Sequence, residues 1–218
     1  MALGLLAQFQ ADGFAMIPSF AEPEDLASLC DAVASLPQSS RSGGDRNIQN
    51  KSQVINAYAN SDKVIALVSE LIGGNPKLAR AIYFNKTSEQ NWSVAWHQDK
   101  TVAVSSEVNT TGWTNWSVKG GVSHAQPPTE VFNKMLTIRI HLDAANQTNG
   151  CLKVIPKSHS LGALSQADIP KHTAENNTVY CCANLGDALV MHPLLIHASG
   201  KATESTARRV LHLEYTNN

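Results

Sequence analysis

Residues 186–199 read GDALVMHPLLIHAS, in which a Gly-Asp turn signal is followed by two short apolar runs. Short apolar runs bounded by turn residues are typical of buried β-strands. Strand-like patterns of this kind, with a hydrophobic period of 2 or short apolar runs, begin at residue 78 and continue nearly to the end of the chain. The predicted strands are 78–85, 92–97, 101–105, 134–142, 151–155, 178–182, 188–191, 194–198 and 208–215.

The first third of the chain instead carries apolar side chains at helical spacing. We predict one helix over 3–11 and a second from Pro23, a residue that the first turn of a helix tolerates. A third helix begins after Ser61, a possible N-cap, and ends at Gly73.

Many short strands after a helical start favour a mainly β (α+β) fold, either a β-barrel or a double-sheet jelly roll with helices packed on its outside. The length is that of one sizeable domain. We therefore expect a single domain over 1–218, with a helical start over 1–77 and a jelly-roll core over 78–218.

The composition is that of an ordinary globular protein, with 43% hydrophobic and 16% charged residues, which excludes a disordered or coiled-coil chain. The net charge is −1, so we expect neither nucleic acid nor an anionic membrane as a partner. No apolar run reaches the roughly 20 residues of a membrane-spanning helix, and the first residues lack the features of a signal peptide. The four cysteines have no CxxC spacing, and we expect a cytoplasmic location.

One long segment departs from the strand pattern. Residues 106–133 are punctuated by Gly and Pro and contain Trp116 and Lys119. Loops of this length inside a compact domain are usually functional. We interpret 106–133 as a lid, in which Trp116 and Lys119 would contact a modest-sized substrate with an apolar body and an anionic group.

A candidate metal site is indicated by His97 and Asp99, together with His197 about a hundred residues later. Residues two apart in a strand point to the same face, so a His-x-Asp pair at a strand end offers an imidazole and a carboxylate to one ion. Two histidines and one carboxylate on one face of an octahedral ion leave three positions open, which is typical of non-haem Fe(II) oxygenases. His192 is the alternative to His197 as the third ligand.

Arginines follow in RRVLHLEY (208–215) and in LTIRIHLD (136–143). An open-sided iron needs a co-substrate to reduce dioxygen, and a dicarboxylic keto acid needs a cation at its far end. Alternation along the strand places only one of Arg208 and Arg209 inside the fold. Arg139 either faces inward and binds an anionic substrate or forms a surface ion pair.

Four motifs in this order resemble the phytanoyl-CoA dioxygenase family: WHQD (96–99), NGCLKVIPKSH (149–159), GDALVMHPLLIHAS and RRVLHLEY. The resemblance covers about residues 78–216 and implies a double-stranded β-helix, which is a cupin-like jelly roll. It also implies Fe(II) as the metal, 2-oxoglutarate as the co-substrate and dioxygen as the oxidant. The family's Pro-Gly-Ser-His signature is replaced here by PKSH (156–159), a change expected to alter a turn rather than the metal site.

Position within these motifs carries the family's roles onto individual residues. The implied iron ligands and catalytic centre are His97, Asp99 and His197. The resemblance assigns the distal carboxylate of 2-oxoglutarate to Arg208 and Ser199, and a further co-substrate contact to Asn85 in YFNK (83–86). Halogenating relatives have Gly or Ala at the acidic position, so Asp99 favours hydroxylation or a related oxidation.

The expected function is that of a non-haem Fe(II)- and 2-oxoglutarate-dependent dioxygenase that hydroxylates an unactivated carbon of a small organic substrate. Two other classes remain open, because one fold serves many chemistries. A metal-dependent cupin-like isomerase or lyase would need no 2-oxoglutarate and would leave Arg208 unexplained. A non-catalytic small-molecule-binding module would have a vestigial site.

Overall fold

The computed structural model describes residues 2–37, 44–104, 111–119, 121–204 and 207–217, and its fold is built on antiparallel sheets. The largest sheet has six strands in the order β1 (Phe14–Ile17), β11 (Ala188–Met191), β8 (Met135–His141), β13 (Arg208–Thr216), β3 (Lys77–Lys86) and β2 (Asp45–Arg46). A four-stranded sheet has the order β10 (Val179–Cys181), β9 (Leu152–Val154), β12 (His197–Ser199) and β4 (Val94–His97). A three-stranded sheet has the order β5 (Val102–Val104), β7 (Val122–Gln126) and β6 (Thr114–Lys119).

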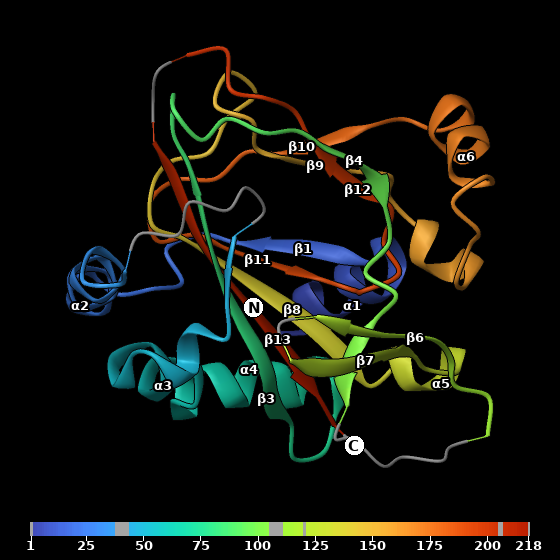
Figure 1. The fold of residues 1–218 in the computed structure, drawn as a ribbon, viewed down its shortest axis with the longest axis horizontal. Coiled ribbons are helices and arrows are strands. Elements are labelled where there is room, and N and C mark those ends of the chain that lie inside the picture. Colours follow the sequence, from blue (N-terminus) through green and yellow to red (C-terminus); the bar gives the residue numbers. More distant parts are fainter. Residues whose placement is uncertain (1, 38–43, 105–110, 120, 205–206, 218) are drawn as a thin grey trace.

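The helices lie outside these sheets. They are α1 (Ala2–Asp12), α2 (Pro23–Ala34), α3 (Gln53–Ala59), α4 (Asp62–Ile72), α5 (Thr129–Phe132) and α6 (Ile169–Glu175), with short 3₁₀ turns η1 (Ile48–Asn50) and η2 (Ser158–Leu161). In Figure 1 the six-stranded sheet runs between the four-stranded sheet and helices α3 and α4. Within the described residues, no helix is long and apolar enough to cross a membrane.

Alternation along the central strands divides the core into two parts. On β13, Leu211 and Leu213 are fully buried against the helices, in a cluster that also contains residues of α2, α3 and α4. A second cluster joins the two larger sheets, because it contains Leu189 and Met191 of β11 together with Leu152 of β9. The six-stranded sheet therefore has helices on one face and the smaller sheet on the other, and between the sheets it can hold a site.

The predicted fold class is confirmed: the chain is mainly β, with helices packed outside, and the two larger sheets are not closed into a barrel. Each predicted strand overlaps an observed one. The range 1–77 differs from the prediction, because β1 and β2 pair with β11 and β3 at the edges of the six-stranded sheet. The predicted strand 194–198 begins only at His197, since Leu195 N–H closes a turn onto the carbonyl of His192.

The predicted loop 106–133 is wrong where the structure describes it. Strands β6 and β7 form a hairpin there, and α5 follows. Trp116 is 50% exposed, and Val118 on the same strand is also exposed. Residues 106–110 and 120 lie outside the described residues, as does the side chain of Lys119. The hypothesis that Trp116 and Lys119 contact the substrate stays a prediction.

Candidate metal centre

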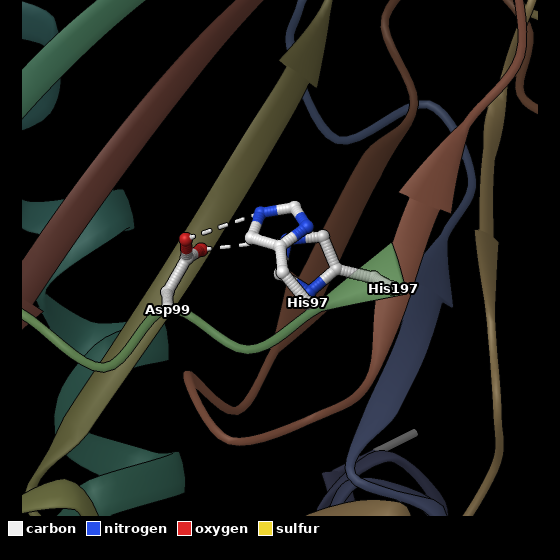
Figure 2. Close-up of side chains that lie close together, drawn as sticks. All are labelled: His97, Asp99 and His197. Atoms are coloured by element: carbon white, nitrogen blue, oxygen red, sulfur yellow. Dashed lines mark ion pairs between the residues drawn. The ribbon is translucent and has the colours of Figure 1, made fainter. Parts of the chain in front are cut away.

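Two neighbouring strands bring the two histidines together. His97 ends β4, His197 begins β12, and the two residues are direct partners in the antiparallel ladder. Their ring centroids are 4.2 Å apart. Asp99 follows two residues after His97, where its N–H donates to the carbonyl of Pro193 at 2.9 Å. Figure 2 shows the three side chains pointing toward one another.

The distances in this cluster suit a single ion. Nε2 of His97 lies 3.7 Å from Oδ1 of Asp99, and Nε2 of His197 lies 3.5 Å from Oδ2 of Asp99. One ligand atom from each residue can be chosen so that all lie within 4.8 Å of one another. Ligands about 2.1 Å from an ion and at right angles to each other are about 3 Å apart. The triad therefore needs little movement to bind a metal on one face.

Both imidazoles present the nitrogen that a metal needs. Nδ1 of His97 lies 2.8 Å from the carbonyl of Ala95, and Nδ1 of His197 lies 2.8 Å from the carbonyl of Leu195. A carbonyl oxygen can only accept, so each Nδ1 carries a proton, and in the neutral ring it is Nε2 that holds the lone pair. Such backbone bonds fix both the tautomer and the ring orientation of metal-binding histidines.

The protonation states also favour a cation. Burial raises the pKa of Asp99, but the neighbouring His197 and His97 outweigh it and lower the pKa to about 2. Burial lowers the pKa of His197 to about 4, against the opposing effect of Asp99. At neutral pH the carboxylate is therefore ionised and the imidazole of His197 is neutral. These are the forms that coordinate divalent metals.

The residue between the first two ligands anchors them. Gln98 is buried, and its side-chain amide donates to the carbonyls of Gly162 and Leu194, at 2.8 and 2.7 Å. Its amide oxygen accepts the N–H of Leu164 at 2.8 Å. Because Gln98 points away from the triad, these bonds hold the HxD segment against the neighbouring loops. Gln98 is not among the residues predicted from the sequence, although alternation from His97 places it on the opposite side of the strand.

The triad lies in a cavity of about 280 Å³ between the six-stranded and four-stranded sheets. Its apolar walls include Phe84, Trp92 and Leu152. Arg208 and Ser199 line the same cavity, and both are buried. Burial lowers the pKa of Arg208 to about 10. Among the described residues, no carboxylate pairs with Arg208, and its Nε has no hydrogen-bond partner.

Arg209 has a different environment from Arg208. Its guanidinium forms a two-point ion pair with Asp143, with Nε to Oδ2 at 2.9 Å and Nη2 to Oδ1 at 2.8 Å. It is not among the residues that line the triad cavity. Of the two adjacent arginines, Arg208 is therefore the one that faces the triad.

Asn85 lies apart from the other expected site residues. Phe84 faces the triad cavity, so its neighbour Asn85 points to the opposite side of β3 and lines a separate cavity with Tyr83 and Arg209. The motif position therefore does not bring Asn85 to the triad. His192 is also separate, since its ring packs against His159 at 5.4 Å and its Nδ1 accepts the N–H of Leu194.

A chain of polar side chains forms the other half of the cavity wall. Arg139 Nη1 contacts His212 Nδ1 at 2.8 Å, and His212 Nε2 contacts Glu214 Oε1 at 3.2 Å. Arg80 binds both oxygens of Glu214, at 2.7 and 2.9 Å. Burial raises the pKa of Glu214, but His212 and Arg80 outweigh it and the net shift is downward. Alternation along β13 was the sequence signal for His212 and Glu214. These residues lie four and six positions after the inward-facing Arg208, and so they share its side of the strand.

The comparisons give a family for this arrangement. A family model described as Phytanoyl-CoA dioxygenase (PhyH) matches residues 9–210. No curated protein sequence matches the chain significantly. Many solved structures match the chain.

The epimerase SnoN, in complex with Fe³⁺, α-ketoglutarate and nogalamycin RO, is 17% identical with a TM-score of 0.75, over 99% of this chain and 83% of that one. The carbocyclase SnoK from nogalamycin biosynthesis is 14% identical with a TM-score of 0.74, over 98% and 83%. EctD from S. alaskensis, with 2-oxoglutarate and 5-hydroxyectoine, is 18% identical with a TM-score of 0.75, over 97% and 74%. At these identities the likeness shows a shared fold.

Proposed function

Since the chain belongs to the phytanoyl-CoA dioxygenase family, we propose that it hydroxylates an unactivated carbon of a small organic substrate. The family makes it an enzyme of the Fe(II)- and 2-oxoglutarate-dependent oxygenase type, with iron as the metal and 2-oxoglutarate as the co-substrate. One observation carries the proposal: a metal-ready His-Asp-His triad shares its cavity with a buried arginine that has no carboxylate partner among the described residues.

The donor set fits iron and the keto acid. Two neutral imidazoles and one carboxylate on one side of an ion are the ligands of non-haem iron oxygenases. A buried guanidinium without a counter-ion is costly and is stabilised by a carboxylate ligand. We therefore assign His97, Asp99 and His197 to the iron, and Arg208 with the hydroxyl of Ser199 to the distal carboxylate of 2-oxoglutarate.

The chain's own residues position and shield the reaction. When bound, iron with 2-oxoglutarate and dioxygen supplies the oxidising chemistry, and the keto acid ends as succinate and carbon dioxide. The backbone bonds to both Nδ1 atoms keep the Nε2 lone pairs directed at one point, so binding requires no ring flip. Arg208 orients the co-substrate from the far end, while Phe84 and Leu152 keep water from part of the cavity.

Anaerobic titration of the purified protein with Fe(II) and then 2-oxoglutarate tests the proposal. We expect a weak visible charge-transfer band that appears only when both are present. His97→Ala should abolish it, whereas His172→Ala, in α6 outside the cavity, should leave it unchanged. Tight binding of another metal without the band would favour a cupin-like isomerase or lyase, and absence of metal binding would favour a binding module.

Product analysis tests the reaction type. Hydroxylation adds one oxygen atom to the substrate, epimerisation leaves its mass unchanged, and oxidative ring closure removes two hydrogen atoms. Once a substrate that stimulates succinate release is found, mass spectrometry of its product separates these outcomes. An unchanged mass or a loss of two hydrogens would overturn hydroxylation while leaving the enzyme class intact.

A cytoplasmic location is part of the proposal, supported by the four free thiols.

A further inference from the structure

The cavity contains a second buried cation that the proposed function does not use. Arg139, in the middle of β8, is 5% exposed and lines the cavity together with the triad. Its guanidinium lies over the ring of Phe84, with Cζ 5.4 Å from the centroid. Burial, followed by the charge of Arg208, lowers the pKa of Arg139 to about 9. An anion in the cavity would relieve both effects.

The guanidinium of Arg139 has donors to spare. Among the described residues it makes a single hydrogen bond, from Nη1 to Nδ1 of His212 at 2.8 Å. Its Nε is buried without a partner. A buried charged group with unsatisfied donors costs free energy unless a ligand completes it. Arg139 is therefore arranged to receive an acceptor rather than to stabilise the empty fold.

The acidic side chains of the cavity do not serve this purpose. Within the described part of the chain, Asp99 and Glu214 are the acidic residues that line it. Asp99 faces the two imidazoles, and Glu214 is held at both oxygens by Arg80. Neither carboxylate therefore forms an ion pair with Arg139.

A fixed chain of bonds orients Arg139. Arginine can only donate, so His212 Nδ1 accepts and His212 Nε2–H donates to Glu214. Arg80, which holds Glu214, also donates from Nη1 to Nε2 of His124 at 3.0 Å. Each bond sets the donor and acceptor roles of the next. The planar guanidinium is held before any ligand arrives, which suits two-point recognition of a carboxylate.

We propose that Arg139 binds a carboxylate of the organic substrate, and that the enzyme acts on small carboxylic acids. The inference rests on the proposed function, in which Arg208 takes the distal carboxylate of 2-oxoglutarate and leaves Arg139 for the substrate. A cavity of about 280 Å³ that also holds the co-substrate limits the acid to a compact one. His212, Glu214 and Arg80 are positioning residues for Arg139.

Calorimetry on the anaerobic protein loaded with Fe(II) and saturating 2-oxoglutarate tests this inference. The probes are matched pairs of acid and primary amide: butanoate with butanamide, hexanoate with hexanamide, and benzoate with benzamide. Saturating 2-oxoglutarate keeps the acids away from Arg208. We expect at least one acid to bind about tenfold or more tightly than its amide, and Arg139→Gln to remove that preference. Arg139→Lys should keep part of it.

The co-substrate titration separates the possible failures. We expect Arg139→Gln to leave the 2-oxoglutarate dissociation constant within about twofold of the wild-type value, as should the control Arg209→Gln on the opposite strand face. A large rise in Arg139→Gln would assign Arg139 to the co-substrate and overturn the inference. Equal binding of acids and amides by the wild-type protein, or binding of no pair, would overturn it too. If the wild-type protein showed no charge-transfer band with Fe(II) and 2-oxoglutarate, the proposed function itself would be refuted.

Discussion

The two faces of strand β13 have opposite characters although both are buried. On the side toward the helices, Arg209 pairs with Asp143 at the start of the strand, and beyond it Leu211, Leu213 and Tyr215 pack in the helix-facing core. The side chains that face the cavity are charged or titratable: Arg208, His212 and Glu214. Successive residues of one strand therefore serve different purposes. The helix face removes apolar area from water, which is favourable in any orientation. The cavity face carries charges whose burial is costly unless each finds a partner.

This contrast predicts which substitutions change the free energy of unfolding and which change ligand binding. Changes on the helix face should alter the free energy of unfolding and leave ligand binding alone. Changes of the unpaired cation Arg208 on the cavity face should alter ligand binding and leave stability alone, or even raise it. The triad extends the cavity face onto β4 and β12, because His97 and His197 pair across the ladder.

The largest effect is expected at the triad. His97→Ala should abolish Fe(II) binding and substrate-dependent succinate release together, a loss of more than about a thousandfold, because it removes one of the two imidazole ligands on which the affinity of the site for iron depends. His172→Ala is the matched control, since it removes a histidine outside the cavity. Anaerobic metal titration and thermal unfolding of the metal-free protein measure the two properties separately. Retention of stoichiometric iron by His97→Ala would contradict the ligand assignment.

The next effect is expected on the helix face. Leu213 is fully buried in the helix-facing core, so Leu213→Ala should lower the free energy of unfolding by about 2–5 kcal/mol. Denaturant titration measures this change, and Leu161→Ala, at a residue 45% exposed, should change it by less than about 0.5 kcal/mol. Below the unfolding transition, the dissociation constant for 2-oxoglutarate should stay at the wild-type value. A raised constant would show that the two faces are not independent.

The sequence predicted the strand core well, because alternation and short apolar runs report directly on burial. The same rule predicted that only one of Arg208 and Arg209 faces inward, and the family resemblance selected Arg208. Where it failed, the signal was misleading or missing. Leu194, Leu195 and Ile196 are apolar because they are buried in a turn, and so they resembled a strand. The hairpin β6–β7 exposes Trp116 and has no clean apolar face, so its strands were not predicted.

The remaining site features depend on pairing that a single sequence does not contain. Arg80 meets Glu214 because the two residues are direct partners between β3 and β13, far apart in the chain. Asn85 fits a motif position, yet alternation from inward-facing Phe84 turns it toward a different cavity. A local motif fixes which residue type is present, whereas strand register decides what it contacts.

A smaller effect than the loss of core packing is expected at Arg208. Arg208→Gln should weaken 2-oxoglutarate binding about 10- to 100-fold, since one charge-assisted contact is lost. The free energy of unfolding should stay constant or rise, because the variant removes a buried cation without a partner among the described residues. The control Arg209→Gln breaks an ion pair with Asp143 on the other face and should leave binding unchanged. If Arg208→Gln bound 2-oxoglutarate as tightly as the wild-type protein, the co-substrate assignment would be refuted.

The smallest effect is expected at Ser199. Ser199→Ala removes a single hydroxyl from the cavity wall while keeping the strand β12 backbone that pairs with β9. Loss of one neutral donor costs about 0.5–1.5 kcal/mol, so 2-oxoglutarate binding should weaken about two- to tenfold. In a double-mutant cycle with Arg208→Gln, the two losses should fall short of additivity if both groups contact the same carboxylate. Full additivity would place Ser199 and Arg208 on different groups of the ligand, and the contrast between the faces of β13 would survive without the shared contact.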